Sequence, residues 1–218
     1  MAAAPTFLII RSDSSQRRFA EFCDVAGPAV SAAGGQLVAA RPCQTLRVLE
    51  AGSRAWHTWI ARYPDPDVAR ANLAALPRDG LRGAGEAQVL LAPGLPAPLP
   101  PELAHLPAPR DDQGAETQPP TLMLIEGDAW DDAAMGRYRD IILPLLTSLG
   151  GHYHVYTPGA AVTVLGGDWG RGFLALSRWP AAHAADAFWL AEAYQGAAIP
   201  ARTGAGRFEV VTCVGERD

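Results

Sequence analysis

The sequence predicts an α+β fold: two βαββαβ domains in tandem, with their sheets packed together inside one chain. The first observation behind this prediction is an internal repeat. The same proline, glycine and arginine residues recur 116 residues apart, as in Pro28 and Pro144, Gly34 and Gly150, and Arg62 and Arg178. After the second predicted helix of each copy the separation rises to 121, as in Gly94 and Gly215. A fixed internal period of this kind indicates a duplicated unit.

The second observation is a change of composition in the middle of the chain. Residues 92–120 are rich in proline and partly acidic, which favours a semi-rigid extended connector over a helix or a strand. We therefore expect one domain at residues 1–92, a linker at 93–120 and a second domain at 121–218. Each half is long enough to bury a core of its own.

The second half predicts its elements in the order strand, helix, strand, strand, helix, strand, at residues 121–127, 128–151, 152–167, 170–179, 180–195 and 206–214. Asp128 or Asp131 can cap the first helix, and the glycine pair Gly150-Gly151 can end it. Residues 152–167 are expected to form one long or broken strand. The glycine-rich segment after it, Gly166–Gly172, joins two strands and predicts a hairpin rather than a phosphate-binding loop.

The first half predicts the same order, at residues 6–11, 14–35, 36–51, 55–63, 64–76 and 86–92. This βαββαβ order is the ferredoxin-like arrangement. A four-stranded sheet of this kind leaves one apolar face open to water. Packing that face against the equivalent face of the other half covers both faces at once.

Composition excludes several classes of function. The formal net charge is −5 without a basic patch, which argues against a nucleic-acid partner. All 18 basic residues are arginine, so no mechanism can use a lysine Schiff base. The isolated residues Cys23, Cys43 and Cys213 predict neither a disulfide framework nor a cysteine-ligated zinc site. Dinucleotide, phosphate-loop and nucleophile-elbow motifs are lacking, and we expect no cofactor and no metal. Short apolar runs and the lack of a basic leader predict a cytoplasmic protein without a membrane partner.

Several motifs of the second half resemble a known family. They are Tyr138, Pro144, Gly150-Gly151, Val164–Trp169, Arg178–Trp189, Tyr194-Gln195 and Arg202. Together they resemble the bacterial family called domain of unknown function thirteen-thirty, over nearly all of residues 121–216, and the first half resembles it more weakly. The chain departs from the family pattern at Ala191-Glu192-Ala193, where the family shows Ser-Pro-Glu, and at Gly166, where it shows glutamate.

The resemblance implies membership of the dimeric α/β-barrel superfamily. That superfamily includes cofactor-free monooxygenases, ring-opening oxygenases, lactone isomerases, polyketide cyclases, heme-handling proteins and ligand sensors, so fold alone leaves the chemistry open. Two functions from different classes are therefore our hypotheses. One is a cofactor-independent enzyme of bacterial secondary or aromatic metabolism, and the other is a non-catalytic binding or sensor protein.

The candidate site lies in the second half, because polar and aromatic residues gather there that the first half lacks. Tyr138 aligns with Phe22 and His154 with Val38. We expect a pocket for a planar or aromatic small molecule between helices and sheet, where the candidates converge. The candidate catalytic residues are His152, His154 and Tyr138, and the candidate substrate-binding residues are Trp169, Arg178, Trp189, Tyr194 and Arg202.

Each candidate has a role in the enzyme hypothesis and a structural alternative. His152 or His154 would transfer a proton, Tyr138 or Tyr194 would hydrogen-bond an oxyanion, and Arg202 would hold a carboxylate or enolate. The two histidines should share one strand face, with Tyr153 and Val155 on the other. They equally suit a solvated strand edge. Arg178 suits a structural ion pair, as at Arg62, while Tyr138 and Trp189 suit a core. His57 and Trp59 are minor candidates for a second site. The chain is expected to be a monomer with an internal pseudo-dimer, or a homodimer.

Overall fold

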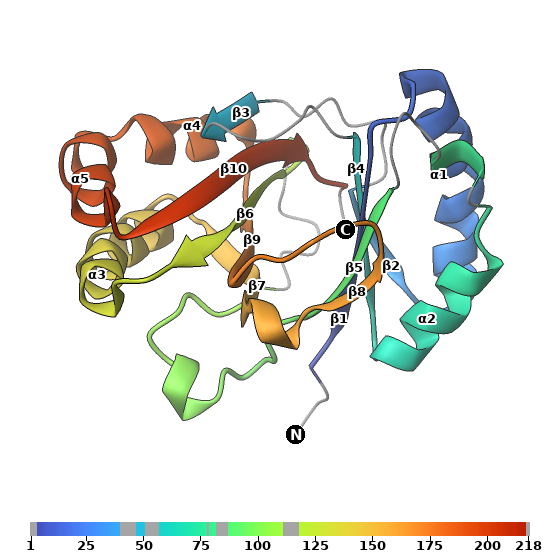
Figure 1. Ribbon diagram of the computed structural model, residues 1–218, viewed down its shortest axis with the longest axis horizontal. Helices are drawn as coiled ribbons and strands as arrows, with labels where there is room; N and C mark the ends of the chain where they lie inside the picture. Colours follow the sequence, from blue (N-terminus) through green and yellow to red (C-terminus); the bar gives the residue numbers. More distant parts are fainter. Residues whose placement is uncertain are drawn as a thin grey trace.

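The computed structural model of the protein describes residues 4–39, 47–50, 57–77, 79–81, 87–110 and 118–216. Two five-stranded antiparallel sheets pack face to face, and helices cover the outer face of each sheet (Figure 1). The predicted fold class is therefore confirmed: the two halves form an α+β barrel within one chain. In the described part of the chain, no helix is long and apolar enough to cross a membrane.

The first half contains β1 (Thr6–Ser12), α1 (Gln16–Ala32), β2 (Gln36–Ala39), β3 (Arg47–Glu50), β4 (His57–Tyr63), α2 (Pro66–Ala75), the short helix η1 (Asp79–Leu81) and β5 (Gln88–Pro93). The linker carries one short helix, η2 (Pro101–Leu103).

The second half contains β6 (Thr121–Ala129), α3 (Asp132–Ser148), β7 (His152–Pro158), the short helix η3 (Gly159–Ala161), β8 (Thr163–Gly166), β9 (Phe173–Trp179), α4 (Ala182–Leu190), the π-helix η4 (Tyr194–Ala198), α5 (Ile199–Arg202) and β10 (Gly206–Val214). Three pairs of elements have bounds that lie 116 residues apart at both ends: α1 and α3, β3 and β8, and β4 and β9.

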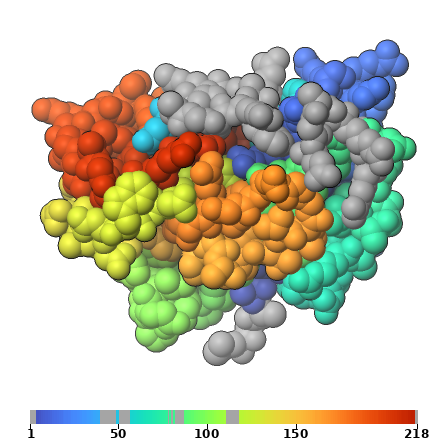
Figure 2. Space-filling model, viewed as in Figure 1, coloured from blue at the N-terminus to red at the C-terminus, as the bar shows by residue number. Residues whose placement is uncertain are grey.

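The two halves exchange a strand. One sheet has the order β2-β4-β1-β5-β8 and the other β3-β10-β6-β9-β7, so each sheet ends in a short strand from the opposite half. Of the two forms expected for residues 152–167, one long strand or a broken one, the structure has the broken strand, and its second part crosses to the partner sheet. The predicted hairpin at Gly166–Gly172 is wrong for the same reason, because β8 pairs with β5 and not with β9. In the space-filling view, the orange segment that includes β8 lies across the boundary between the halves (Figure 2).

Three cores hold the layers together. The inter-sheet core draws on both sheets, with Phe7 and Ile9 of β1 packed among Leu122, Leu124 and Leu176. The first-half core lies between its sheet and α1 and α2, and the second-half core lies between its sheet and α3 and α4. Because both apolar sheet faces meet each other, neither is left in contact with water.

The glycine pairs Gly34-Gly35 and Gly150-Gly151 have the same two structural roles in their respective halves. Gly34 and Gly150 end α1 and α3 with positive φ angles of 72° and 78°, a conformation that a side chain would strain. The next glycine, Gly35 or Gly151, lies close to a ring on the neighbouring strand. A Cβ there would come within 2.9 Å of Tyr63 or Trp179. Two glycines are needed because one turns the chain and the other lets the strand pass under the ring.

The described part of the linker packs against the second half. Leu95 and Leu106 are buried in the second-half core. The backbone N–H of Leu95 donates to the carbonyl oxygen of His154 at 2.8 Å, so the linker covers part of the free edge of β7. Apart from η2 it has no helix or strand in residues 94–110. The covered edge has fewer free backbone groups that a second chain could pair with.

Candidate functional site

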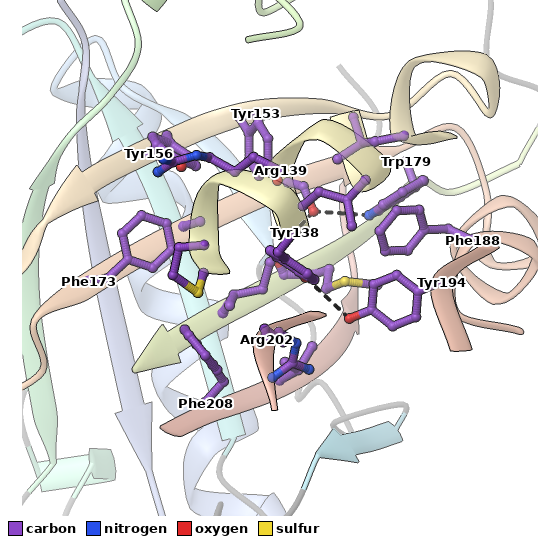
Figure 3. A pocket seen from close by; sticks show the side chains of 18 residues that line it. Tyr138, Arg139, Tyr153, Tyr156, Phe173, Trp179, Phe188, Tyr194, Arg202 and Phe208 are labelled. Atoms are coloured by element: carbon purple, nitrogen blue, oxygen red, sulfur yellow. Dashed lines mark hydrogen bonds between the residues drawn. The ribbon is translucent and has the colours of Figure 1, made fainter. Parts of the chain in front are cut away.

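A cavity of about 40 Å³ lies between the second-half sheet and α3 (Figure 3). Six aromatic rings form part of its wall and come from β7, β9, α4 and β10: Tyr153, Tyr156, Phe173, Trp179, Phe188 and Phe208. The space exists because Ala175 and Ser177, two small residues, face the helices from the middle of β9. An aromatic wall of this kind favours a planar, apolar ligand.

Three polar side chains gather at one end of this cavity, which we call the polar end: Tyr138, Tyr194 and Arg202. The hydroxyl groups of Tyr138 and Tyr194 lie 3.4 Å apart. The guanidinium carbon of Arg202 lies 5.4 Å from the centre of the Tyr138 ring and 4.9 Å from that of Phe208. Figure 3 shows the three side chains converging from α3, η4 and α5. The polar end therefore offers hydrogen-bond donors beside an apolar wall.

Arg202 is held by a residue of the first half. Its Nη1 donates to Oε1 of Glu50 at 3.0 Å, and its Nη2 donates to the other carboxylate oxygen. Glu50 is the last residue of β3, the strand that crosses from the first half, and it pairs with Val210 of β10. The Arg202 side chain is buried, and its Nε has no hydrogen-bond partner among the described residues. The Nε–H donor of the guanidinium is thus left unused.

The environment keeps both tyrosines neutral and the arginine charged. Burial raises the pKa of Tyr138 well above its usual value, and the neighbouring Tyr194 raises it further. Burial also raises the pKa of Tyr194, although the Tyr138 hydroxyl and Arg202 partly offset this. Burial alone would lower the pKa of Arg202, but Glu50 and the tyrosines raise it above its usual value. Near pH 7 the polar end has two neutral hydroxyl groups and one compensated cation.

The segment that carries Tyr194 and Arg202 is the part of the second half that is five residues longer. The separation between equivalent positions rises from 116 to 121 between the second helix and the last strand of each half. In the second half this region forms η4 and α5, which pack against α3. The first half has η1 there, and its Leu81 is buried in the first-half core. The extra residues therefore build the polar end, and π-helical turns of this kind are frequent at functional sites.

A second cavity of about 580 Å³ adjoins the first on the side of the linker. The two cavities share five lining residues: Met135, Arg139, Tyr156, Phe173 and Phe208. The inner cavity has room for a few water molecules or for the polar end of a ligand. The outer cavity has room for the rest of a larger molecule, and the shared residues form the passage between them.

His152, His154 and Arg178 do not line either cavity. Arg178 lies opposite His152 on the adjacent strand. The rings of His152 and His154 are 5.1 Å apart, and His154 lies 5.4 Å from Phe7 of the inter-sheet core. These residues therefore face the opposite sheet, and the expected convergence with Tyr138 is wrong for them. Their predicted role in proton transfer stays a prediction.

A β-bulge between Tyr153 and Val155 corrects one further expectation. Tyr153 lies in the second-half core as expected, but Val155 is buried in the inter-sheet core, on the same side as His154. The extra residue of a bulge breaks the alternation of faces along a strand. The first half has the same irregularity between Leu37 and Ala39, which places Val38 and His154 at equivalent positions.

Two more candidates also lie outside the cavity. Trp169 donates from Nε1 to Oε1 of Glu126 at 2.6 Å and packs against the inter-sheet core. Trp189 stacks behind Tyr194, with ring centres 5.0 Å apart, and does not line the cavity. Of the eight candidate residues, the structure thus brings together Tyr138, Tyr194 and Arg202, with Trp189 supporting Tyr194.

Among the described residues that line the inner cavity, none is a histidine, a cysteine or a carboxylate. Within the described ranges, His, Cys, Asp and Glu form no group of three that could hold a metal ion. Cys23 and Cys213 are buried, and Cys43 lies outside the described residues. The side chains of this cavity therefore suit an organic ligand rather than a metal.

The sequence did not identify most of the residues of this site, and two of them show why. Ala175 carries no chemical signal, but its equivalent in the first half is Trp59, and that difference in size could have indicated a hollow. Glu50 lies 152 residues from Arg202 in the chain, and no local pattern links the two.

Comparisons with known proteins support the fold. Residues 120–215 match the family described as Domain of unknown function (DUF1330). Curated proteins give no significant match. Among similar solved structures, an anthrone oxidase-like protein has a TM-score of 0.56 at 12% identity, covering 99% of this chain and 92% of that chain.

Two further structures are similar over their length. A candidate monooxygenase from Fusobacterium nucleatum subsp. nucleatum has a TM-score of 0.53 at 10% identity, covering 99% of this chain and 94% of that chain. A variant of chlorite dismutase from Candidatus Nitrospira defluvii has a TM-score of 0.51 at 10% identity, covering 99% and 92%. At these identities the likeness shows the fold alone, the dimeric α/β barrel.

Proposed function

We propose that this chain, whose residues 120–215 match the family described as Domain of unknown function (DUF1330), is a small enzyme that acts on a planar aromatic metabolite with an oxygen substituent. The substrate oxygen would lie at the polar end, its ring against the aromatic wall and its remainder in the outer cavity. The observation that carries the proposal is the convergence of Tyr138, Tyr194 and Arg202 at the end of an otherwise apolar cavity. The names of two structural neighbours, a candidate monooxygenase and an anthrone oxidase-like protein, are compatible with such a substrate.

The chemistry proposed is stabilisation of a phenolate or enolate. An oxygenase, a cyclase and an isomerase of this type can share one step, in which the substrate loses a proton and negative charge develops on its oxygen. Neutral tyrosine hydroxyls at the polar end can donate hydrogen bonds to this charge. Their raised pKa values make Tyr138 and Tyr194 donors rather than bases. In the proposal the substrate supplies the reacting electrons itself, so no cofactor is needed.

The proton acceptor in this scheme is water. The described residues that line the inner cavity include no carboxylate and no imidazole, so none of these residues can take the proton as a conventional base. The proton would leave through the outer cavity, where Asp128 and Asp132 line the wall. Because water is a weak base, the scheme suits substrates whose hydroxyl or methylene group is already acidic.

The test is conversion of an acidic polycyclic substrate such as anthrone, a hydroxyanthracene tautomer. We expect the protein to accelerate its conversion, measured by dissolved-oxygen uptake and by mass spectrometry of the product. Tyr194→Phe should slow turnover by about 10²-fold, a typical loss for one oxyanion donor. The control Tyr63→Phe removes a buried tyrosine hydroxyl from the first half and should leave turnover unchanged. Equal rates for Tyr194→Phe and the unmodified protein would refute the proposed role.

A second candidate function is ligand binding without turnover. It is favoured by the lack of a conventional base among the lining residues. Mass spectrometry of the ligand that co-purifies distinguishes the two functions. A ligand recovered unchanged after long incubation in air indicates a binding or sensor protein. We further infer that the first half is a diverged copy of the same family, and that the internal pseudo-dimer is the functional unit, without a second chain. A role in secondary or aromatic metabolism stays a prediction.

A further inference from the structure

We propose that Glu50 determines which ligands bind at the polar end. Glu50 lies on β3, the strand that crosses from the first half, and its charge favours neutral oxygen-bearing aromatics over aromatic carboxylates. The inference rests on the proposed function, because it names the class of ligand for the same cavity. It assigns the first half a direct part in the specificity of the second.

The first step is the geometry of the ion pair. Glu50 binds Arg202 through both carboxylate oxygens and uses both terminal nitrogens of the guanidinium. A fork-to-fork pair of this kind is the arrangement in which an arginine would otherwise hold a ligand carboxylate. Glu50 thus occupies the position that an anionic ligand would need.

The second step is the balance of charge around the site. Arg202 and Glu50 cancel each other at the polar end. In the passage, Arg139 faces an outer cavity that is also lined by Asp128 and Asp132. Taken together, these described residues carry two positive and three negative charges. An incoming carboxylate would therefore meet a slightly negative site as well as an apolar wall, and burying it there is costly.

The third step is what remains for a ligand. The polar end still has hydrogen-bond donors: the hydroxyls of Tyr138 and Tyr194 and the unused Nε–H of Arg202. The charge of Arg202 is already neutralised by Glu50, so these donors do not require an anionic ligand. A phenol, ketone or quinone oxygen can accept from such donors without displacing Glu50. The polar end is built for an oxygen that is neutral when it binds.

The experiment compares two probes that share one ring system, naphthol and naphthoate, by titration calorimetry at pH 7. For the unmodified protein we expect naphthol to bind at least about tenfold more tightly. Glu50→Gln keeps the shape of the side chain but frees the charge of Arg202. It should raise the affinity for naphthoate by about tenfold or more and leave that for naphthol little changed.

Three variants serve as controls. Glu209→Gln breaks a similar pair with Arg171 on the same sheet but outside both cavities, and should not alter the preference. The double change Glu50→Gln and Arg202→Gln removes both charges, leaves no unpaired buried ion, and should keep the preference for naphthol. This double variant can also be tested if Glu50→Gln alone fails to fold. Ala175→Trp fills the inner cavity and should abolish naphthol binding, which places the probe there.

The outcomes separate the two proposals. If naphthoate binds the unmodified protein as well as naphthol does, or if Glu50→Gln leaves the ratio unchanged, Glu50 does not set selectivity, while the cavity remains the ligand site. If naphthol binds and Ala175→Trp has no effect, the ligand site lies elsewhere and both proposals fail. If neither probe binds at millimolar concentration, the site does not take oxygen-bearing aromatics, and both proposals fail as well.

Discussion

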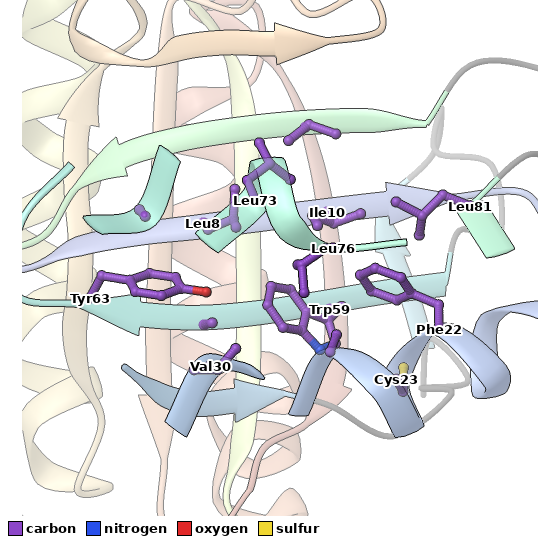
Figure 4. Packing of buried hydrophobic residues seen from close by; sticks show 14 of the residues in the cluster. Leu8, Ile10, Phe22, Cys23, Val30, Trp59, Tyr63, Leu73, Leu76 and Leu81 are labelled. Atoms are coloured by element: carbon purple, nitrogen blue, oxygen red, sulfur yellow. The ribbon is translucent and has the colours of Figure 1, made fainter. Parts of the chain in front are cut away.

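The two halves have the same order of main strands and helices, but they differ in how the space under the first helix is occupied. In the first half, Trp59 of β4 is fully buried against Phe22 of α1, with ring centres 5.7 Å apart (Figure 4). In the second half the equivalent residues are Ala175 and Tyr138, and the cavity lies between them. The difference shows that this fold does not need a cavity under its first helix. The second half has one because a large side chain is missing there.

The halves also differ in charge at one matched position. Arg11 lies opposite Gln88, and Glu126 lies opposite Glu209, so Arg11 and Glu126 hold equivalent places in β1 and β6. Their side chains form a buried ion pair at 2.6 Å across the two sheets. Two identical copies would bring like charges together here. The opposite charges favour pairing of one half with the other over pairing with itself.

The largest effect is expected from reversing that charge. Glu126→Arg should lower the free energy of unfolding by about 3–5 kcal/mol or more, because it removes the partner of Arg11 and buries a second cation. The double change Arg11→Glu and Glu126→Arg should recover much of the loss. Urea unfolding of the unmodified protein and of the two variants measures both the loss and the recovery of stability. Equal losses in the single and double variants would mean that the pair does not specify the contact.

Opening the filled half is the second test. Trp59→Ala should lower the free energy of unfolding by about 3–5 kcal/mol, the cost of removing a fully buried aromatic side chain and leaving a cavity. Naphthol binding to the second half should persist in the folded fraction. Calorimetric melting measures the first effect and titration the second. A loss below about 1 kcal/mol would mean that the first half already tolerates a hollow at this position.

Filling the hollow half is the converse. Ala175→Trp imports the residue of the first half and should cost about 1–3 kcal/mol, because the cavity absorbs only part of the new volume. Ligand binding should nevertheless be lost. Melting temperature and titration are compared with those of Ala175→Val, which adds much less volume. Binding retained by the tryptophan variant would show that the cavity is not the site.

A smaller effect is expected at the matched position on the first helix. Tyr138→Phe gives α3 the residue that α1 has at Phe22, and the lost hydrogen bond to Tyr194 is long at 3.4 Å. Stability should change by less than about 1 kcal/mol, while affinity for naphthol should fall about threefold to tenfold. Chemical denaturation and titration measure the two quantities. A large loss of stability with unchanged affinity would make Tyr138 a core residue only.

The smallest effect concerns pH. Burial lowers the pKa of His154 well below its usual value of 6.5, and His152, Arg178 and Arg62 lower it further. The unfolded chain therefore binds a proton near pH 6.5 that the folded chain refuses, so stability is full above that pH and falls as the pH drops below it. His154→Val, which copies Val38, should reduce this decline. Urea midpoints at pH 8 and pH 5 give the difference, and parallel declines would contradict the assignment.

Local signals predicted the main strands and helices, but not η4 and α5. Asp131 caps α3 through the Ala134 N–H, and Gly150 ends that helix, as its neighbours in sequence indicate. The exchange of β3 and β8 between the two sheets was not predictable in this way. Their local sequence indicates that they are strands, but it does not indicate which strand each of them pairs with. The bulge beside His154 was missed for a similar reason. A single extra residue leaves the alternating pattern readable while reversing the faces of the later residues in the strand.

The candidate site was predicted in part. Tyr138, Tyr194 and Arg202 stood out because the first half has no equivalents of their polar groups. Glu50 could not be found, since its role depends on a strand that crosses between sheets. His152 and His154 stood out equally as polar residues, and only the three-dimensional structure shows that the sheet separates them from the cavity.

The strand exchange also fixes the order in which the protein can be completed during synthesis. The outermost strand of the first sheet is β8, whose residues Thr163–Gly166 leave the ribosome long after β5 is made. The second sheet in turn must wait for β10 before β3 has anything to pair with. Until β8 and β10 are made, the nascent first half exposes the free edge of β5, and β3 has no strand to pair with. Such long-range pairings form slowly. Conditions that slow synthesis of the second half should therefore prolong the period in which the first half is prone to aggregate.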